Sequence, residues 1–303
     1  MSGVGVTDIA EEGTGMTTKY FILPKIHMLA LVGIVTTLLL AACGGGTAST
    51  STASTTPTAT LARVTAIAHG TLAHVPKGSA ELTWNAVSKI LTVKLSLTGL
   101  APHSIHPSHI HSGSCSIPGR LIYPLQYVVA DATGNATVTS TVPNIVDGIP
   151  ATGWMIYVHN GPYVTSDDQS LPITCGDISN PGGAKAVQAT MSSTTERDQA
   201  VGGSVQLTLR GQQLWVQLTL SGLQPGSTHP ARIDAGSCTR QGNVVFQLHN
   251  VVANAAGNVN MTTVLDNVSA IPSSGWYVNV HYSMDLSTQA GADSIACGDI
   301  VSR

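Results

Sequence analysis

The chain has 303 residues and a net charge of −3 at pH 7, with 10% charged and 43% hydrophobic residues. A chain of this length has room for about two domains. It contains no lysine- and arginine-rich patch, no Walker-type loop and no dinucleotide-binding glycine motif after a strand. These absences exclude nucleic acid as a partner and the nucleotide-dependent enzymes that use such loops.

The beginning of the chain has the features of an export signal. Lys19 and Lys25 precede a continuous apolar run at 28–42, which is typical of a secretory signal peptide. The run is shorter than the roughly 20 residues of a spanning helix. It ends in Leu-Ala-Ala-Cys, which resembles the bacterial lipobox, whose cysteine is lipidated. We therefore expect residues 1–43 to be a lipoprotein signal, with Cys43 anchoring an exported, extracytoplasmic protein to the bacterial cell membrane; the alternative is a transmembrane anchor.

Residues 44–60 consist almost entirely of glycine, serine, threonine and alanine. Such a segment has little to bury and is expected to be a disordered linker. It would hold the folded part of the protein away from the membrane.

The rest of the chain repeats itself at a shift of 122–125 residues. This repeat predicts two tandem domains, at 61–182 and 185–303, each large enough for its own core. The matching stretches are GSAELTW at 78–84 with GSVQLTL at 203–209, LSLTGL at 95–100 with LTLSGL at 218–223, VVADATGNA at 128–136 with VVANAAGNV at 251–259, and CGDI at 175–178 with CGDI at 297–300.

Each copy has a β pattern. Apolar and polar residues alternate at 91–97 and in part at 214–220, and glycine-containing turns at 133–135 and 256–258 separate such runs. No segment after the signal has a sustained helical period. Short strands with frequent turns predict an all-β sandwich or barrel in each copy.

The four remaining cysteines predict disulfides, because an exported chain with an even number of cysteines meets an oxidising environment. Several connectivities are possible. The repeat selects one bridge in each copy, Cys115 with Cys175 and Cys238 with Cys297. No C-x-x-C motif is present, so we expect these bridges to be structural.

Three histidines suggest a metal site in the first copy. His109 and His111 alternate with Ile110, so both imidazoles point to the same face of a strand. His159 ends a second apolar strand. Imidazole suits copper, zinc, iron and nickel. The alternative is a polar strand face that holds no metal.

The order of these motifs resembles two related groups of proteins. A Gly-Leu pair, a histidine-rich turn, His-x-His, a cysteine, a strand ending in Val-His, and Cys-Gly-x-Ile follow one another. This order is similar to that of the copper/zinc superoxide dismutases, which are Greek-key β-barrels, and to that of the chordin-type CHRD domain. The resemblance implies that His109, His111 and His159 bind copper. Apart from the resemblance, His103 and His106 are candidates for an extra ligand, although the counterpart of His106 in the second copy, His229, favours a structural role for His106.

Several departures leave enzyme activity open. The segment 116–123 lacks the histidines that supply the dismutase zinc site, so zinc is not expected. The anion-guiding arginine before the second cysteine is replaced by Pro172 and, in the second copy, by Ser294. The second copy also has Arg232 and Asp234 in place of the two paired histidines and keeps only His281. We therefore expect it to be a degenerate copy.

Three functions remain open at this stage. The first is copper-dependent removal of superoxide at the cell surface, and the second is copper binding without turnover. The third is a metal-free CHRD-type envelope module that presents a surface to an unidentified protein partner. The pair Asp167 and Asp168 is expected to be either a solvated turn or an outer support for a ligand imidazole.

Overall fold

The computed structural model describes residues 63–302. The expected signal peptide at 1–43, its Cys43 and the linker at 44–60 lie outside the described residues and stay predictions. The described part is all-β, as expected, with two one-turn helices, α1 (Asp167–Ser170) and α2 (Gln289–Ala292). Neither of these described helices is long and apolar enough to cross a membrane.

One group of strands forms what we call the first lobe. Its strands are β2 (Lys77–Asn85), β3 (Ile90–Thr98), β5 (Ser108–Ser114), β6 (Ile117–Pro124), β8 (Ala136–Val142), β9 (Trp154–His159), β10 (Pro172–Ile178) and β11 (Ala186–Met191). They form two antiparallel sheets with the orders β11-β2-β3-β8 and β10-β9-β5-β6. Leu82 and Val93 of one sheet share a hydrophobic core with Ile110 and Ile156 of the other.

A second group of strands forms the second lobe. Its strands are β1 (Val64–His74), β12 (Gly202–Arg210), β13 (Gln213–Ser221), β15 (Ala231–Ser237), β16 (Arg240–Gln247), β18 (Val259–Leu265), β19 (Trp276–His281) and β20 (Ser294–Ser302). They form one eight-stranded sheet, β16-β15-β19-β20-β1-β12-β13-β18. Its two ends contribute to one core, in which Val216 of β13 and Ile233 of β15 are both buried.

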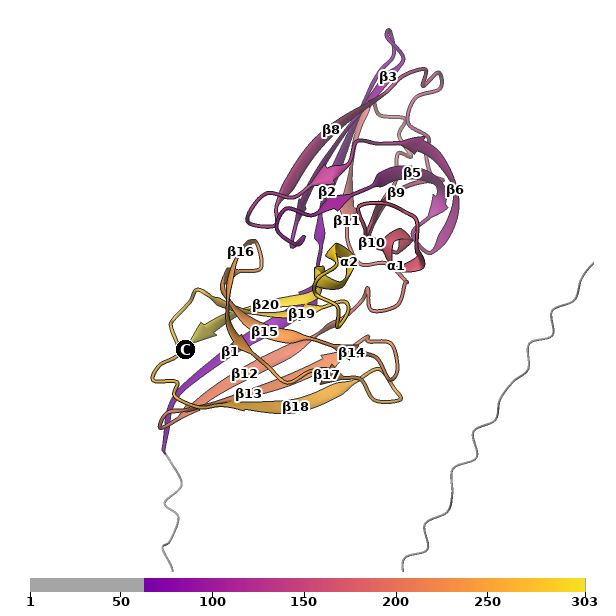
Figure 1. The fold of residues 1–303 in the computed structure, drawn as a ribbon. Coiled ribbons are helices and arrows are strands. Elements are labelled where there is room, and N and C mark those ends of the chain that lie inside the picture. The colour runs from indigo at the N-terminus through magenta and orange to yellow at the C-terminus, as the bar shows by residue number, and fades with distance from the viewer. Residues whose placement is uncertain (1–62, 303) are drawn as a thin grey trace, which may run out of the picture. The chain divides into compact units, whose positions relative to one another are not determined.

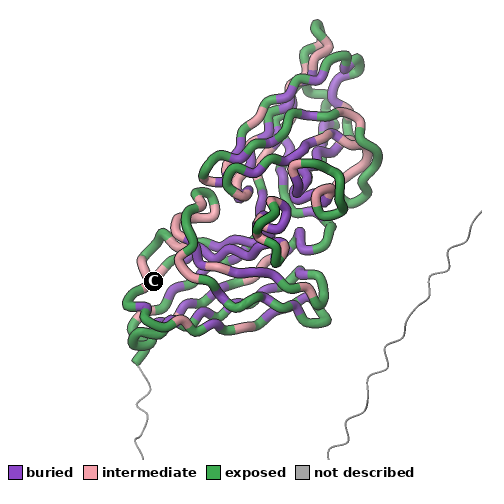
Figure 2. The backbone as a smooth tube through the Cα atoms, viewed as in Figure 1, coloured by how far each residue is buried: buried purple, intermediate pink, exposed green. Residues whose placement is uncertain are grey.

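The pleat explains why these sequences form strands with one buried face. In β13, which reads QLWVQLTLS, exposed and buried residues alternate without a break. Leu214, Val216 and Leu218 are almost fully buried, because successive side chains of a strand point to opposite faces. Figure 2 shows buried and exposed residues alternating along the strands, with longer exposed stretches in the connecting loops.

Two strands, β1 and β11, each pair with strands that lie far from them in sequence. Strand β1 precedes all first-lobe strands in sequence, yet it pairs with β12 and β20 of the second lobe. Conversely, β11 pairs with β2 of the first lobe, although it lies close to β12 in the chain. Figure 1 shows both strands in these positions. The lobes thus exchange their first strands, while the expected boundaries 61–182 and 185–303 remain a prediction.

The strand order of the second lobe is that of the first, with β1 in the place of β11. In the first lobe, an isolated β-bridge between the backbones of Cys175 and Ser192 joins β10 to the residue that follows β11. At the corresponding place in the second lobe, β20 pairs with β1 as strands of one sheet. Two short pairs also correspond. They are β4 (Ile105–His106) with β7 (Val128–Val129), and β14 (Thr228–His229) with β17 (Val251–Val252).

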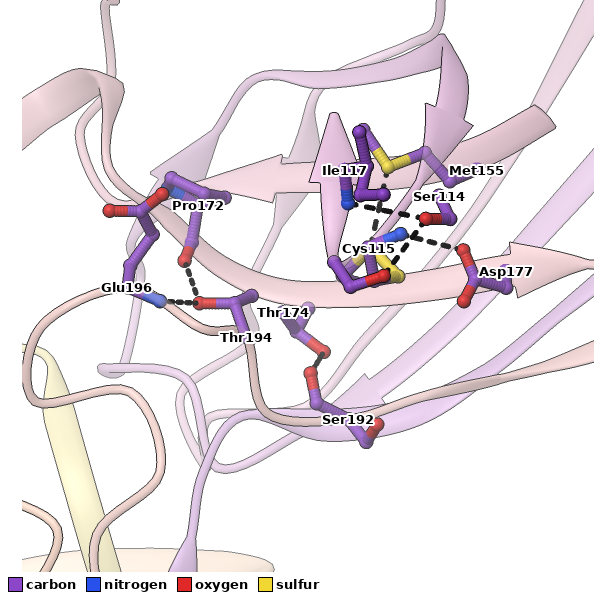
Figure 3. The surroundings of a disulfide bond; sticks show 12 residues. Ser114, Cys115, Ile117, Met155, Pro172, Thr174, Asp177, Ser192, Thr194 and Glu196 are labelled. Carbon is purple, nitrogen blue, oxygen red and sulfur yellow. Dashed lines mark hydrogen bonds between the residues drawn. A yellow bond between two sulfur atoms is a disulfide. The ribbon is translucent and has the colours of Figure 1, made fainter. Parts of the chain in front are cut away.

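Both expected disulfides are present, Cys115–Cys175 in the first lobe and Cys238–Cys297 in the second. The backbone N–H of Cys115 donates a hydrogen bond of 2.7 Å to the Asp177 carboxylate, as Figure 3 shows. Cys238 makes the same bond to Asp299. Each disulfide therefore ties the turn between two sheet strands to another strand of its lobe, β10 in the first lobe and β20 in the second.

Candidate metal site

Two neighbouring strands bring His109, His111 and His159 to one face of the first lobe. In the pairing of β5 with β9, His109 lies opposite Tyr157 and His111 opposite Met155. Ile110, between the two histidines, is fully buried in the core. The imidazoles therefore point away from the core, on the opposite face of the sheet, as the sequence pattern predicts.

The three side chains converge closely. One ligand nitrogen from each imidazole lies within 4.8 Å of those from the other two. The ring centres are 5.1 Å apart for His109 and His159, 5.8 Å for His109 and His111, and 6.2 Å for His111 and His159. Bonds from a metal ion to imidazole nitrogen are about 2 Å long, so the three rings need to move inward only slightly to bind one ion.

Two backbone carbonyls orient the rings. The Nδ1–H of His159 donates to the Ser170 carbonyl oxygen at 2.6 Å, and Nδ1–H of His111 donates to the Gly119 carbonyl at 3.2 Å. In both rings Nε2 is then the nitrogen with a free lone pair. Metal-bound histidines commonly use their other nitrogen in this way.

Orphaned polar atoms test whether a metal fits here. The Nε2 atom of His111 and the Nδ1 atom of His109 are buried without a hydrogen-bond partner. A buried polar atom that lacks a partner is costly. A divalent ion would satisfy both atoms at once, and the all-nitrogen donor set suits copper or zinc.

The surroundings of two rings, those of His109 and His159, favour their neutral form. Burial, together with the positive charges that His159 and His111 would carry, lowers the pKa of His109 to about 4. Burial is also the main cause that lowers the pKa of His159, although its hydrogen bond to Ser170 opposes the shift. Neutral imidazole is the form that binds a metal, so protons compete weakly for these two ligands near pH 7.

The two suggested extra ligands lie outside this group. His106 is fully buried, and its Nδ1–H donates to the His159 carbonyl at 2.8 Å while its Nε2 lies 2.7 Å from the Ser104 hydroxyl. Both of its ring nitrogens are thus engaged. His103 is exposed at a turn with a positive φ of 63°. Within the described residues, neither belongs to the cluster of ligand atoms.

Two contributors to the site were not identified from the sequence. The carbonyl of Ser170 orients His159, whereas the neighbouring Asp168 instead bonds Arg197 and Tyr282, each at 2.9 Å. The Tyr157 ring packs 5.3 Å from the His111 ring and 6.0 Å from the His159 ring. Its placement two residues before His159, on the same strand face, is the signal that could have revealed it.

Comparison with known proteins bears on the second lobe. The model of the CHRD domain family matches residues 183–285. A CHRD domain is therefore found in this part of the chain. The CHRD match runs from β11 to just beyond β19, so it includes His281 but not the histidine triad.

Other comparisons add little. No curated protein matches the chain. A solved structure titled "Crystal Structure Analysis of the clock protein EA4" is similar over 33% of this chain and 87% of that one. The sequence identity is 19% and the TM-score is 0.26.

Proposed function

We propose that this protein is a non-catalytic, CHRD-type module of the cell envelope that binds one copper ion through His109, His111 and His159. The convergence of these three imidazoles within 4.8 Å carries the proposal. The CHRD domain at 183–285 supports a binding or interaction module rather than an enzyme.

Copper is the proposed ion because of the donor set. Three nitrogen ligands with no thiolate or carboxylate among them suit late first-row metals, and Cu²⁺ forms the most stable complexes of these divalent ions. Zinc ranks lower on the same scale, and segment 116–123 lacks the histidines of a dismutase zinc site.

Binding without turnover is favoured over superoxide dismutation. Pro172 takes the position at which the dismutases carry the anion-guiding arginine. It lies opposite His159 in the pairing of β9 with β10, so no cation stands at that position beside the site. The slightly negative net charge also gives no general attraction for a small anion.

The module is proposed to consist of two tandem copies and to be lipid-anchored through Cys43 outside the cytoplasmic membrane. The identical strand order of the two lobes supports the duplication. Two disulfides support an oxidising compartment. The signal pattern at 1–43 and the linker at 44–60 support export and tethering.

Metal analysis tests this proposal. Residues 61–303 are incubated with copper and zinc, excess metal is removed, and the bound metal is counted. We expect about one copper per chain, lost in a His109→Ala/His111→Ala variant, and no superoxide turnover by the loaded protein. Turnover that disappears in the same variant would favour the enzyme. Absence of bound metal would leave the metal-free interaction module as the function.

A further inference from the structure

A buried polar cluster on β15 and β19 of the second lobe contains four atoms that lack hydrogen-bond partners. They are Arg232 Nε, Asp234 Oδ1, Asn279 Oδ1 and His281 Nε2. Asp234 and Asn279 are each 1% exposed and His281 is 3% exposed. Native proteins rarely leave buried polar atoms unpaired, so such a concentration at one place calls for a physical explanation.

The residues of this cluster occupy the same positions in the strand pairing as those of the histidine triad. Arg232 lies opposite Asn279, and Asp234 lies opposite Tyr277 in the pairing of β15 with β19. His109 and His111 have the same relation to β9. Arg232 and Asp234 therefore project from β15 at the two positions from which the first lobe projects its paired imidazoles.

The third position is unchanged between the lobes. His281 ends β19 as His159 ends β9, and its Nδ1–H donates to the Ala292 carbonyl at 2.6 Å. This bond fixes the ring and leaves Nε2 with a free lone pair. His281 thus has the orientation and the free nitrogen of a metal ligand.

The guanidinium of Arg232 nevertheless places a positive charge in this cluster. The Arg232 guanidinium lies 3.6 Å from Asp234 Oδ1, and its side chain is 20% exposed. Its charge, after burial, contributes to lowering the pKa of His281 to about 4. Arg232 lies opposite Asn279, two residues before His281, so the guanidinium and the imidazole project from the same face of the sheet.

We infer that the guanidinium of Arg232 takes the place of a metal ion in the second lobe, so that this polar cluster is a latent metal site blocked by one residue. Removing that cation while supplying one more imidazole leaves a carboxylate and two histidines around the same point. This donor set, two imidazoles and one carboxylate, is one that zinc accepts. The inference goes beyond the proposed function and uses the first lobe only as a geometric template.

The test is the variant R232H in a chain that also carries H109A and H111A, so that the triad cannot contribute. Zn²⁺ and Cu²⁺ are added separately, and bound metal is counted after removal of the excess. We expect about one metal ion per chain for R232H. We expect none for the matched control R232K, whose lysine keeps a positively charged side chain in the cluster. A melting temperature that rises with added Zn²⁺ only in R232H is expected as well.

A second variant guards against misfolding. R232H/D234H reproduces the ligand set of the first lobe, and both variants are refolded with and without metal, so that folding only in the presence of metal counts as uptake. If neither variant takes up metal, or if R232K takes up as much as R232H, the inference is overturned. Because the triad is absent throughout, failure of the triad to bind copper would not affect this result.

Discussion

His159 and Ser170 are joined by a hydrogen bond of 2.6 Å from the imidazole Nδ1–H to the backbone carbonyl, and Ser170 is the last residue of α1. His281 makes the same bond to Ala292, the last residue of α2. In each lobe a single helical turn therefore orients one imidazole. The lobes differ in the residues that β5 and β15 place beside it, so the oriented histidine alone does not define a metal site.

This relationship predicts that two equivalent substitutions have different effects. His159→Ala removes one of three converging ligands and should weaken copper binding by more than the ~10–100-fold that loss of an outer partner costs. His281→Ala should leave copper affinity unchanged, because no second imidazole stands beside it. Titration calorimetry of both variants measures this difference. Equal loss of affinity would mean that both lobes contribute to binding.

The strands and the shared direction of His109 and His111 were predictable from the sequence because both depend on local alternation, whereas the assignment of His159 as the third copper ligand rests on the family resemblance. A strand places residues two apart on one face, so the pattern His-Ile-His defines the direction of His109 and His111 wherever the strand lies. The orientation of His159 was not predictable. Its partner is a backbone carbonyl, which every residue has, and so Ser170 carries no sequence signal.

The exchange of β1 and β11 was also beyond the sequence pattern. The alternating residues of 64–74 do not specify which lobe receives the strand, because the two lobes have the same strand order. Which sheet receives the strand depends on the connections that follow it. A span of two residues separates β1 from β2, whereas ten separate β11 from β12, and periodicity does not encode how such connections direct the chain.

The disulfide of the first lobe should be a large contributor to stability. Cys115 and Cys175 are 60 residues apart, and closing a loop of this size stabilises a protein by about 4 kcal/mol in the chain-entropy model. We expect Cys115→Ser/Cys175→Ser to lower the free energy of unfolding by roughly this amount in urea titrations. A change below about 1 kcal/mol would imply that the bridge mainly positions its turn.

Acid should destabilise the protein through its buried neutral histidines. Burial lowers the pKa of His74 to about 4, and the charge of Lys77 adds to this shift. The Nε2–H of His74 donates a hydrogen bond to the Ile173 carbonyl at 3.0 Å. The unfolded state then binds more protons than the folded state between pH 6.5 and 4. Stability is therefore present above pH 6.5 and is lost as the pH falls through this window.

A glutamine at position 74 isolates that contribution. His74→Gln can keep a donor to Ile173 but does not titrate, so its free energy of unfolding should fall by about 1.6 kcal/mol less than that of the unaltered chain between pH 6.5 and pH 5. Urea titrations at the two pH values measure this slope. His69→Gln, the same substitution at an exposed position of the same strand, provides the control. Identical slopes for all three proteins would show that His74 does not govern the acid response.

The strand exchange makes a prediction about where damage spreads. Leu72 lies in β1, early in the chain, yet it is 2% exposed in the core of the second lobe. Met191 lies in β11 and is fully buried in the core of the first lobe. Leu→Ala and Met→Ala in such cores each cost about 2–5 kcal/mol, so both variants should be measurably destabilised.

Hydrogen exchange separates the two variants by location. Leu72→Ala should lower amide protection first in β12 and β20, the two strands that flank β1, whereas Met191→Ala should do so in β2, the strand paired with β11. A chain without exchange gives the reverse pattern, because each substituted strand would then lie in the sheet of its sequence neighbours. Loss of protection in β2 on substitution of Leu72 would therefore overturn the exchanged arrangement, because it would place β1 in the sheet of the first lobe.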